Sequence, residues 1–176
     1  MKISSRLSSS ALELNYFSPF AVFEYLREET GCSSVVLYDR ESITQHRNGE
    51  AEARRIVVQE IIEDKGFKVV AYVNEIGSGK SCSLHNRSEF HKAVEIAKKF
   101  CVPIVAPSVD RIIRPCEYNK RNQLAPLMDS DLACLDNYID DVFIMTVIPP
   151  GLFLVEVQEI FEAWDRRGKA MLTKVR

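Results

Sequence analysis

Residues 38–42 (YDRES) carry side chains suited to phosphate chemistry. They begin at the last residue of a β-branched run over 33–38, which predicts a strand. In open α/β sheets, ligand sites gather at the carboxyl ends of the strands, so a substrate would meet Ser42 there, with Arg40 beside it. The ordinary alternative is a serine that caps a turn next to an arginine in solvent.

A second segment, residues 110–114 (DRIIR), follows the predicted strand over 103–106. Arg111 and Arg114 are three residues apart and share a face of a helical turn. Two guanidiniums suit a phosphate because each offers planar paired donors, and Asp110 could orient one of them or handle a proton. The alternative is an aspartate that caps a helix, followed by surface arginines.

The third segment is the glycine-containing run 75–79 (EIGSG), with Arg87 beyond it. Glycines let a backbone approach a ligand or turn sharply, although an ordinary flexible connection needs them as well. Residues 79–81 (GKS) also suggest a nucleotide-binding P-loop. That motif asks for glycine at position 74, where Asn74 stands, and for a helix that starts at Lys80, whereas the helical pattern starts near Arg87.

The elements that must position these residues follow from hydrophobic periodicity. Strands alternate with helices through the first two thirds of the chain, which predicts a parallel sheet with helices packed on it. In chain order we expect a short helix around Phe23 that ends near Gly31, a strand over 33–38, a polar loop over 42–49, a helix over 50–65 stopped by Gly66, a strand over 67–73, a loop over 77–83, a helix over 90–100, a strand over 103–106, a helix over 117–127, a strand over 142–148 and a last helix over 153–164.

Composition limits the classes of protein to consider. The apolar share is 46% and the formal net charge is −2, which fits a globular domain and argues against a simple basic coat for nucleic acid. Five cysteines lie far apart without a CxxC pair, which indicates reduced thiols in the cytoplasm and no metal site. No apolar run approaches a membrane span, and no secretory signal is recognisable.

Taken together, the segments resemble the resolvase/invertase family of serine site-specific recombinases. That family has a strand that ends in Tyr-x-Arg-x-Ser, an acidic residue before Ser-Gly, an arginine that opens a helix, and Asp-Arg-x-x-Arg after a strand. The match spans roughly residues 33 to 115, about half of the chain. The matching residues are Tyr38, Arg40, Ser42, Glu75, Ser78, Gly79, Arg87, Asp110, Arg111 and Arg114.

The resemblance implies an enzyme that cleaves and rejoins DNA through a 5′-phosphoserine intermediate, without metal or nucleotide. Ser42 would be the nucleophile. The arginines Arg40, Arg87, Arg111 and Arg114 would stabilise the phosphate charge, and Asp110 would position Arg111 or assist proton transfer. Tyr38, Glu75, Ser78 and Gly79 would support the site. His46, His85 and His91 lie outside the matched positions and receive no role.

The implied architecture is an α/β domain with a mainly parallel sheet of four to five strands, helices on its faces and a C-terminal oligomerisation helix. We expect a leader with a short helix over 1–32, a catalytic domain over 33–150, and a C-terminal helix with a basic tail over 151–176. The partners would be DNA and further copies of the chain in a dimer or tetramer, and a separate DNA-binding protein is a further candidate. In the tail, Arg166, Arg167 and Lys169 could contact DNA phosphates or simply suit the helix end.

One feature keeps another function open. Asp39 and Glu41 flank Arg40, where carboxylates oppose phosphate binding unless they point away. Alternation along a strand would turn them to the face opposite Arg40. A non-catalytic relative that serves as a regulatory or assembly module is therefore the alternative, beside the P-loop protein.

Overall fold

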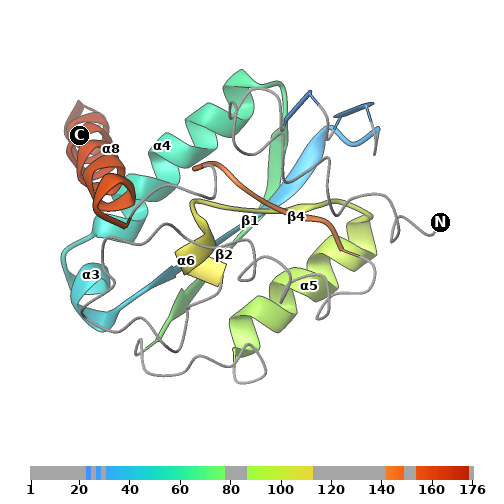
Figure 1. Ribbon diagram of the computed structural model, residues 1–176, viewed down its shortest axis with the longest axis horizontal. Helices are drawn as coiled ribbons and strands as arrows, with labels where there is room; N and C mark the ends of the chain where they lie inside the picture. The colour runs from blue at the N-terminus through green and yellow to red at the C-terminus, as the bar shows by residue number, and fades with distance from the viewer. Residues whose placement is uncertain are drawn as a thin grey trace.

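The computed structural model describes residues 23–24, 27–28, 31–77, 87–112, 142–148 and 154–174. Its centre is a sheet of four strands in the order β2-β1-β3-β4, and every neighbouring pair runs parallel (Figure 1). The strands are β1 (Ser34–Glu41), β2 (Lys68–Ile76), β3 (Ile104–Ala106) and β4 (Ile144–Thr146). The predicted α/β class with a parallel sheet and a C-terminal helix is confirmed.

Helices cover both faces of this sheet. They are α3 (Ile43–Arg47), α4 (Glu50–Asp64), α5 (Ser88–Phe100), α6 (Val109–Ile112) and α8 (Leu154–Lys174). Helices α5 and α6 pack on one face, α4 packs on the other, and α8 packs against α4 (Figure 1). None of the described helices is long and apolar enough to cross a membrane.

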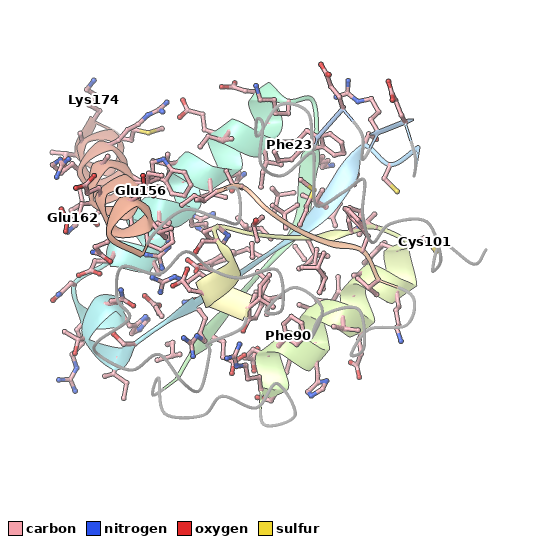
Figure 2. The ribbon with its side chains drawn as sticks, in the orientation of Figure 1. Phe23, Phe90, Cys101, Glu156, Glu162 and Lys174 are labelled. Carbon is pink, nitrogen blue, oxygen red and sulfur yellow. The ribbon has the colours of Figure 1, made fainter. Side chains whose placement is uncertain are left out.

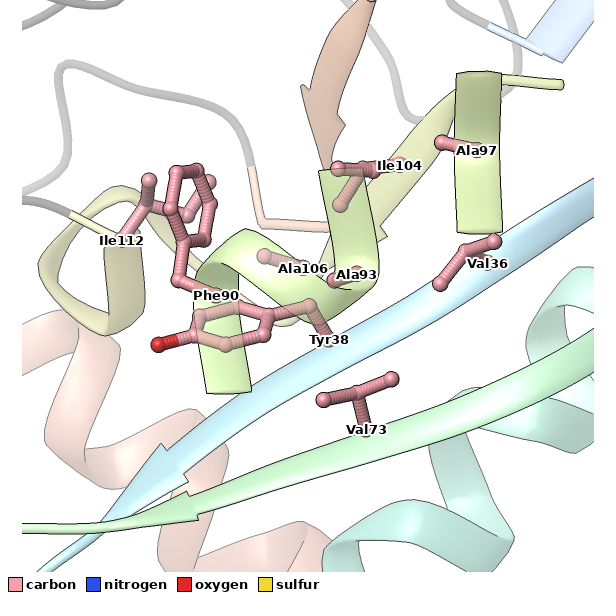
Figure 3. Close-up of a cluster of buried hydrophobic side chains, with 9 residues drawn as sticks. All are labelled: Val36, Tyr38, Val73, Phe90, Ala93, Ala97, Ile104, Ala106 and Ile112. Atoms are coloured by element: carbon pink, nitrogen blue, oxygen red, sulfur yellow. The ribbon is translucent and has the colours of Figure 1, made fainter. Parts of the chain in front are cut away.

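Strand β1 is buried on both faces because it lies inside the sheet. Val36 and Tyr38 point into the cluster beneath α5, where the rings of Tyr38 and Phe90 meet edge to face at 5.1 Å (Figure 3). Val35 and Leu37 point the other way, into the cluster beneath α4. This alternation explains the continuous β-branched run of the sequence, since an inner parallel strand needs apolar side chains on both faces.

Strand β2 contains an irregularity that changes which face its side chains meet. Val35 pairs with Val69, but Val36 pairs with Ala71, so Val70 has no partner in β1. Val69 therefore packs on the α4 face, whereas Ala71 packs on the α5 face, although the two residues are two positions apart. A bulge of one residue produces this change of phase.

Most predicted elements are confirmed, with shifted ends. The strands predicted over 33–38 and 67–73 run on to Glu41 and Ile76, and the last helix continues to Lys174. Gly66, at φ 77°, follows the end of α4 as predicted. Described residues 23–24 and 27–28 of the first predicted helix are helical; the helix predicted over 117–127 and residues 78–83 of the predicted loop lie outside the described residues.

The prediction of a polar loop over 42–49 is wrong, because residues 43–47 form α3. The Ser42 hydroxyl accepts from the backbone N–H of Gln45 at 3.2 Å, and the Gln45 side chain accepts from the backbone N–H of Ser42 at 3.1 Å. This reciprocal capping box starts a helix in a segment that has no apolar periodicity.

Helix α8 packs closely against α4. Val157 and Phe161 of its apolar stripe are buried, Arg167 binds Glu60 of α4, and a Cβ built on Gly168 would stand 2.1 Å from the Ala53 carbonyl oxygen. Figure 2 shows Glu156, Glu162 and Lys174 along the same helix, and these three side chains are exposed. The apolar stripe of α8 is thus largely used within the chain.

Replacing Gly168 with alanine should destabilise the fold, since the added methyl group meets the backbone of α4. Overpacking costs about 1–3 kcal/mol, and the better helix propensity of alanine returns up to about 1 kcal/mol. We expect a net loss of about 2 kcal/mol in the free energy of unfolding, measured by urea denaturation. Gly77→Ala is the matched control, because no atom of the described residues lies within 4 Å of a Cβ at that glycine. Equal losses in both variants would show that the contact with α4 is unimportant.

Candidate active site

Ser42 lies at the carboxyl end of the central strand and is half-buried. It is the N-cap of α3, so its hydroxyl is held at the start of that helix by Gln45. The hydroxyl thus stands at the edge of the sheet where α/β proteins bind ligands.

Arg111 of α6 reaches the same edge. Strand β3 pairs with β1 at Val36 and Leu37, so none of the described strands lies on the β3 side of the last residues of β1. There the Arg111 Nη1 donates to the backbone oxygen of Arg40 at 2.9 Å and to the side-chain oxygen of Gln45 at 3.4 Å. One guanidinium therefore contacts both the strand that leads to Ser42 and the residue that caps with Ser42.

Arg87 stands at the start of α5 and is 2% exposed. Its Nη1 donates to the backbone oxygen of Ile112, the last residue of α6. Its Nη2 is buried and has no hydrogen-bond partner within the described residues. Arg87 thus joins α5 to α6, and within the described part of the chain its Nη2 remains unpaired.

Tyr38 and Glu75 form a hydrogen bond next to Arg87. The Tyr38 hydroxyl donates to Glu75 Oε2 at 2.8 Å. Burial raises the pKa of Tyr38 far above its usual value, the Glu75 charge adds to the shift, and Arg87 opposes it. The hydroxyl is therefore a permanent donor at neutral pH, and it fixes Glu75 at the carboxyl end of β2.

Asp110 lies beside Arg111 in α6. Its Oδ2 is 3.4 Å from the Arg111 Nε, and its other oxygen accepts from the Ser108 hydroxyl. The aspartate lies inside the helix, with Ser108 just before the first turn. This position suits the predicted orientation of Arg111 by a neighbouring carboxylate.

Two guanidiniums share one aromatic ring beneath this edge. The Cζ atoms of Arg111 and Arg54 lie 4.6 and 5.0 Å from the centroid of the Phe161 ring, which comes from α8. A ring face attracts both cations, and α8 thereby forms part of the support for Arg111.

Asp39 supplies the charge that balances these arginines. Its Oδ2 accepts from Arg54 Nε at 2.7 Å, and Asp39 is 1% exposed. Burial raises the pKa of Asp39, while the charges of Arg54 and Arg111 oppose that shift. The carboxylate that flanks Arg40 is thus held on the α4 face by a buried ion pair, as strand alternation predicts.

Glu41 also points away from the face of Arg40. Its Oε1 lies 2.8 Å from His46 Nδ1 and accepts from Asn74 Nδ2 at 2.5 Å. Neither flanking carboxylate therefore shares the face that alternation gives to Arg40 and Tyr38.

The structure gathers most of the candidate residues at the carboxyl ends of β1, β2 and β3. No group of three or more histidine, cysteine or acidic side chains that could hold a metal occurs among the described residues. Arg114, Ser78 and Gly79 lie outside the described residues. The residues gathered there are Tyr38, Arg40, Ser42, Glu75, Arg87, Asp110 and Arg111.

The three basic residues of the predicted tail belong to α8 instead of a separate tail. Arg166 is exposed, Arg167 pairs with Glu60, and Lys169 pairs with Asp165 at 2.8 Å. Two of these three basic side chains thus form ion pairs within the chain.

No family description matches this sequence, and no curated protein sequence is similar to it. Among solved structures, similarity is found to the crystal structure of the C-terminal catalytic domain of ISC1926 TnpA, an IS607-like serine recombinase. The sequence identity is 21%, the TM-score is 0.43, and the match covers 65% of this chain and 67% of that chain. The roles of the residues in this chain therefore rest on their own geometry.

Several residues of the site were not predicted from the sequence. Gln45 could have been found, since Ser-x-x-Gln at 42–45 is a capping-box pattern. Arg54 falls beside Ala53 and Val57 on the buried side of α4, where a charge requires a buried partner. The partner, Asp39, is distant in sequence, and no local pattern joins the two.

The arrangement suits an anion, provided that the arginines exchange partners. Arg87 and Arg111 now donate to backbone carbonyl oxygens, and both side chains are buried. Charged phosphate oxygens are stronger acceptors than carbonyl oxygens, so exchange of these partners is the condition for phosphate binding at this edge.

Arg54→Met should be strongly destabilising, because it leaves Asp39 buried without its partner. We expect a loss of about 3–5 kcal/mol at neutral pH. Without Arg54, the pKa of Asp39 rises further in the folded state. An acid with a raised pKa binds its proton more tightly when folded, so the deficit should shrink as the pH falls.

Denaturant unfolding between about pH 4 and 8 measures both effects. Arg55→Met is the control, since Arg55 pairs with the half-exposed Glu52 at 2.7 Å and such pairs contribute about 0–1 kcal/mol. A deficit for Arg54→Met that stays constant with pH would contradict the assignment of the loss to an ionised Asp39.

Proposed function

We propose that this chain is a serine recombinase catalytic domain that cleaves and rejoins DNA through Ser42. The observation that carries the proposal is the double contact of Arg111 with the Arg40 backbone and with Gln45, the capping partner of Ser42. A hydroxyl and a guanidinium are thereby held in one hydrogen-bonded unit, as attack on a phosphodiester requires.

In the proposed reaction, the Ser42 oxygen attacks the phosphorus of a DNA phosphodiester. The new bond joins Ser42 to the 5′ phosphate, and the bond to the 3′ oxygen breaks, so that a 3′ hydroxyl leaves. Attack by a 3′ hydroxyl on the phosphoserine reverses these changes and rejoins the strand. The bond energy is conserved in the phosphoserine, so no nucleotide is consumed.

The arginines would take the place of a metal in this chemistry. Arg40, Arg87, Arg111 and Arg114 would bind the non-bridging oxygens, where charge accumulates in the transition state. Asp110 would keep Arg111 oriented through the contact at 3.4 Å. Tyr38 and Glu75 would support Arg87, together with Ser78 and Gly79.

The rest of the chain would serve assembly and DNA contact. Strand exchange needs at least two copies, so we assign the chain to a homodimer or tetramer that works in the cytoplasm. Residues 33–150 would form the catalytic unit, residues 1–32 a leader, and residues 151–176 the helix that contacts other copies. Arg166, Arg167 and Lys169 would bind the DNA backbone without reading sequence, which a separate DNA-binding protein could supply.

A second candidate, a non-catalytic module with this fold, is favoured by one observation. The Ser42 hydroxyl is used as a helix cap, and Arg87 and Arg111 both bind backbone oxygens. The P-loop alternative is weaker, because the described helix that follows β2 begins at Ser88, well beyond Lys80.

The proposal predicts a covalent adduct between Ser42 and DNA. The full chain would be incubated with supercoiled plasmids that carry a pool of random inserts, quenched in detergent, and analysed for DNA-linked protein. Proteolysis and mass spectrometry should then find a nucleotide on the peptide that contains Ser42. Ser42→Ala should form no adduct, whereas Ser88→Ala, at the first position of α5, should form as much as the wild type.

Thermal unfolding of both variants controls for folding, because loss of the Ser42 cap should cost about 1 kcal/mol. No adduct from the wild-type chain, or an adduct on a different residue, would favour the non-catalytic module.

A further inference from the structure

Phe161 is the residue of α8 that contacts the arginines of the proposed active site. It is 5% exposed and lies in an apolar cluster with Ile148 and Val157. The Cζ atom of Arg111, which is itself 8% exposed, lies 4.6 Å from the ring centroid. A buried guanidinium over an aromatic ring is held by its charge as well as by packing, because the ring face is electron-rich.

The ring matters more to Arg111 than to Arg54, although both guanidiniums lie over it. Arg54 Cζ is 5.0 Å from the centroid, but Arg54 Nε also donates to Asp39 at 2.7 Å. The acidic neighbour of Arg111, Asp110, lies 3.4 Å from the Arg111 Nε, and that nitrogen has no hydrogen-bond partner within the described residues. Loss of the ring would therefore leave Arg54 in a close ion pair, whereas Arg111 would depend on the hydrogen bonds of its Nη1.

Those Nη1 hydrogen bonds are the ones that phosphate binding has to exchange. Nη1 of Arg111 donates to the Arg40 backbone oxygen at 2.9 Å and to Gln45 Oε1 at 3.4 Å. The contact with the ring occupies no hydrogen-bond donor, because it is an attraction between the charge and the ring face. It is thus the one of these contacts that can persist while Nη1 changes its acceptor.

The position of the ring is set by the packing of α8 on α4. Gly168 lies so close to Ala53 that a Cβ built on it would stand 2.1 Å from the Ala53 carbonyl oxygen. On α8 itself, the ring centroids of Phe161 and Trp164 are 5.8 Å apart. The ring is therefore placed by contacts that do not involve the groups it would orient.

We propose that Phe161 is a positioning residue for Arg111 and that the electron-rich face of its ring, beyond its volume, supports the reaction at Ser42. This inference rests on the proposed function and adds to it a residue of α8 that lies outside the matching segments. The ring keeps the guanidinium at the carboxyl end of β1 while Nη1 passes from the Arg40 carbonyl oxygen to a phosphate oxygen. The charge of the transition state then meets a donor that is already in place.

The test is the rate of adduct formation in single-turnover reactions of the full chain with the supercoiled plasmid pool. Phe161 is replaced by phenylalanines that carry one, two or three fluorine atoms on the ring, which withdraw electrons from the ring face with little change in volume. We expect the rate to fall with each fluorine, by roughly 10- to 30-fold for the trifluorinated ring. Phe161→Leu, which keeps an apolar side chain without a ring, should lower the rate at least as much.

Phe67 provides the matched control. Its ring also has a guanidinium over it, with Arg27 Cζ at 5.3 Å, but Phe67 stands just before the amino end of β2, at the opposite edge of the sheet. Fluorination of Phe67 should leave the rate unchanged. Thermal unfolding of both series separates the two roles, since a merely structural ring at 161 would change stability without a stepwise change in rate.

A second measurement tests the contact in the absence of DNA. Protons over the face of an aromatic ring resonate upfield, so the guanidinium protons of Arg111 should be shifted upfield in the NMR spectrum of the wild-type chain. Arg111→Lys identifies these signals by their loss, and Phe161→Leu should remove the upfield shift.

The outcomes distinguish failure of this inference from failure of the proposed function. No adduct from the wild-type chain overturns the proposed function and, with it, the role of Phe161 in the reaction. An unchanged or faster rate after trifluorination at 161 overturns this inference and leaves Ser42 as the nucleophile. If Phe161→Leu does not fold, the fluorinated series decides, and Arg111 signals without an upfield shift in the wild-type chain also overturn the inference.

Discussion

Strand β1 carries three consecutive charged residues, Asp39, Arg40 and Glu41, into the interior, and each is less than a tenth exposed. Buried charges need partners, so neighbouring elements must supply them. Helix α4 brings Arg54 to Asp39, while α3 and β2 bring His46 and Asn74 to Glu41. The edge of the sheet that holds Ser42 is thus built around charge compensation as much as around apolar packing.

The shortness of β3 adds a second condition. Among the described strands, β3 pairs with β1 at Val36 and Leu37 and does not reach Arg40, so the Arg40 carbonyl takes a donor from outside the described sheet. Arg111 supplies it, and the same guanidinium rests on Phe161 of α8. The Arg111 side chain therefore donates the hydrogen bond that a neighbouring strand would otherwise donate, and α8, which is distant in sequence, packs against this side chain. A displacement of α8 would therefore change the contact between the Phe161 ring and the Arg111 guanidinium.

Sequence alone could predict the elements whose periodicity is strong. The element types were predicted correctly from the apolar runs of β1 and β2 and from the apolar stripes of α4 and α5. The carboxyl ends of the two strands were not predicted, because both strands continue into charged residues, which usually mark loops. Helix α3 was missed because it has no buried residue, so only its capping box could reveal it. The site residues came from short motifs, whereas the contacts among them depend on the chain path: Arg111 meets Arg40 across 71 positions, and Asn74 meets Glu41 across 33.

The bulge at Val70 has a consequence for the surface of the sheet. Strand β2, nine residues long, is an edge of the sheet formed by the described strands, and Val70 and Ile76 on it are exposed. A long regular edge of this kind would invite a strand from another chain to extend the sheet. The bulge interrupts the even spacing of backbone donors and acceptors, so an incoming strand cannot pair along the whole length in one register. The irregularity that turns Val69 and Ala71 to opposite faces thereby also protects the folded chain against aggregation through this edge.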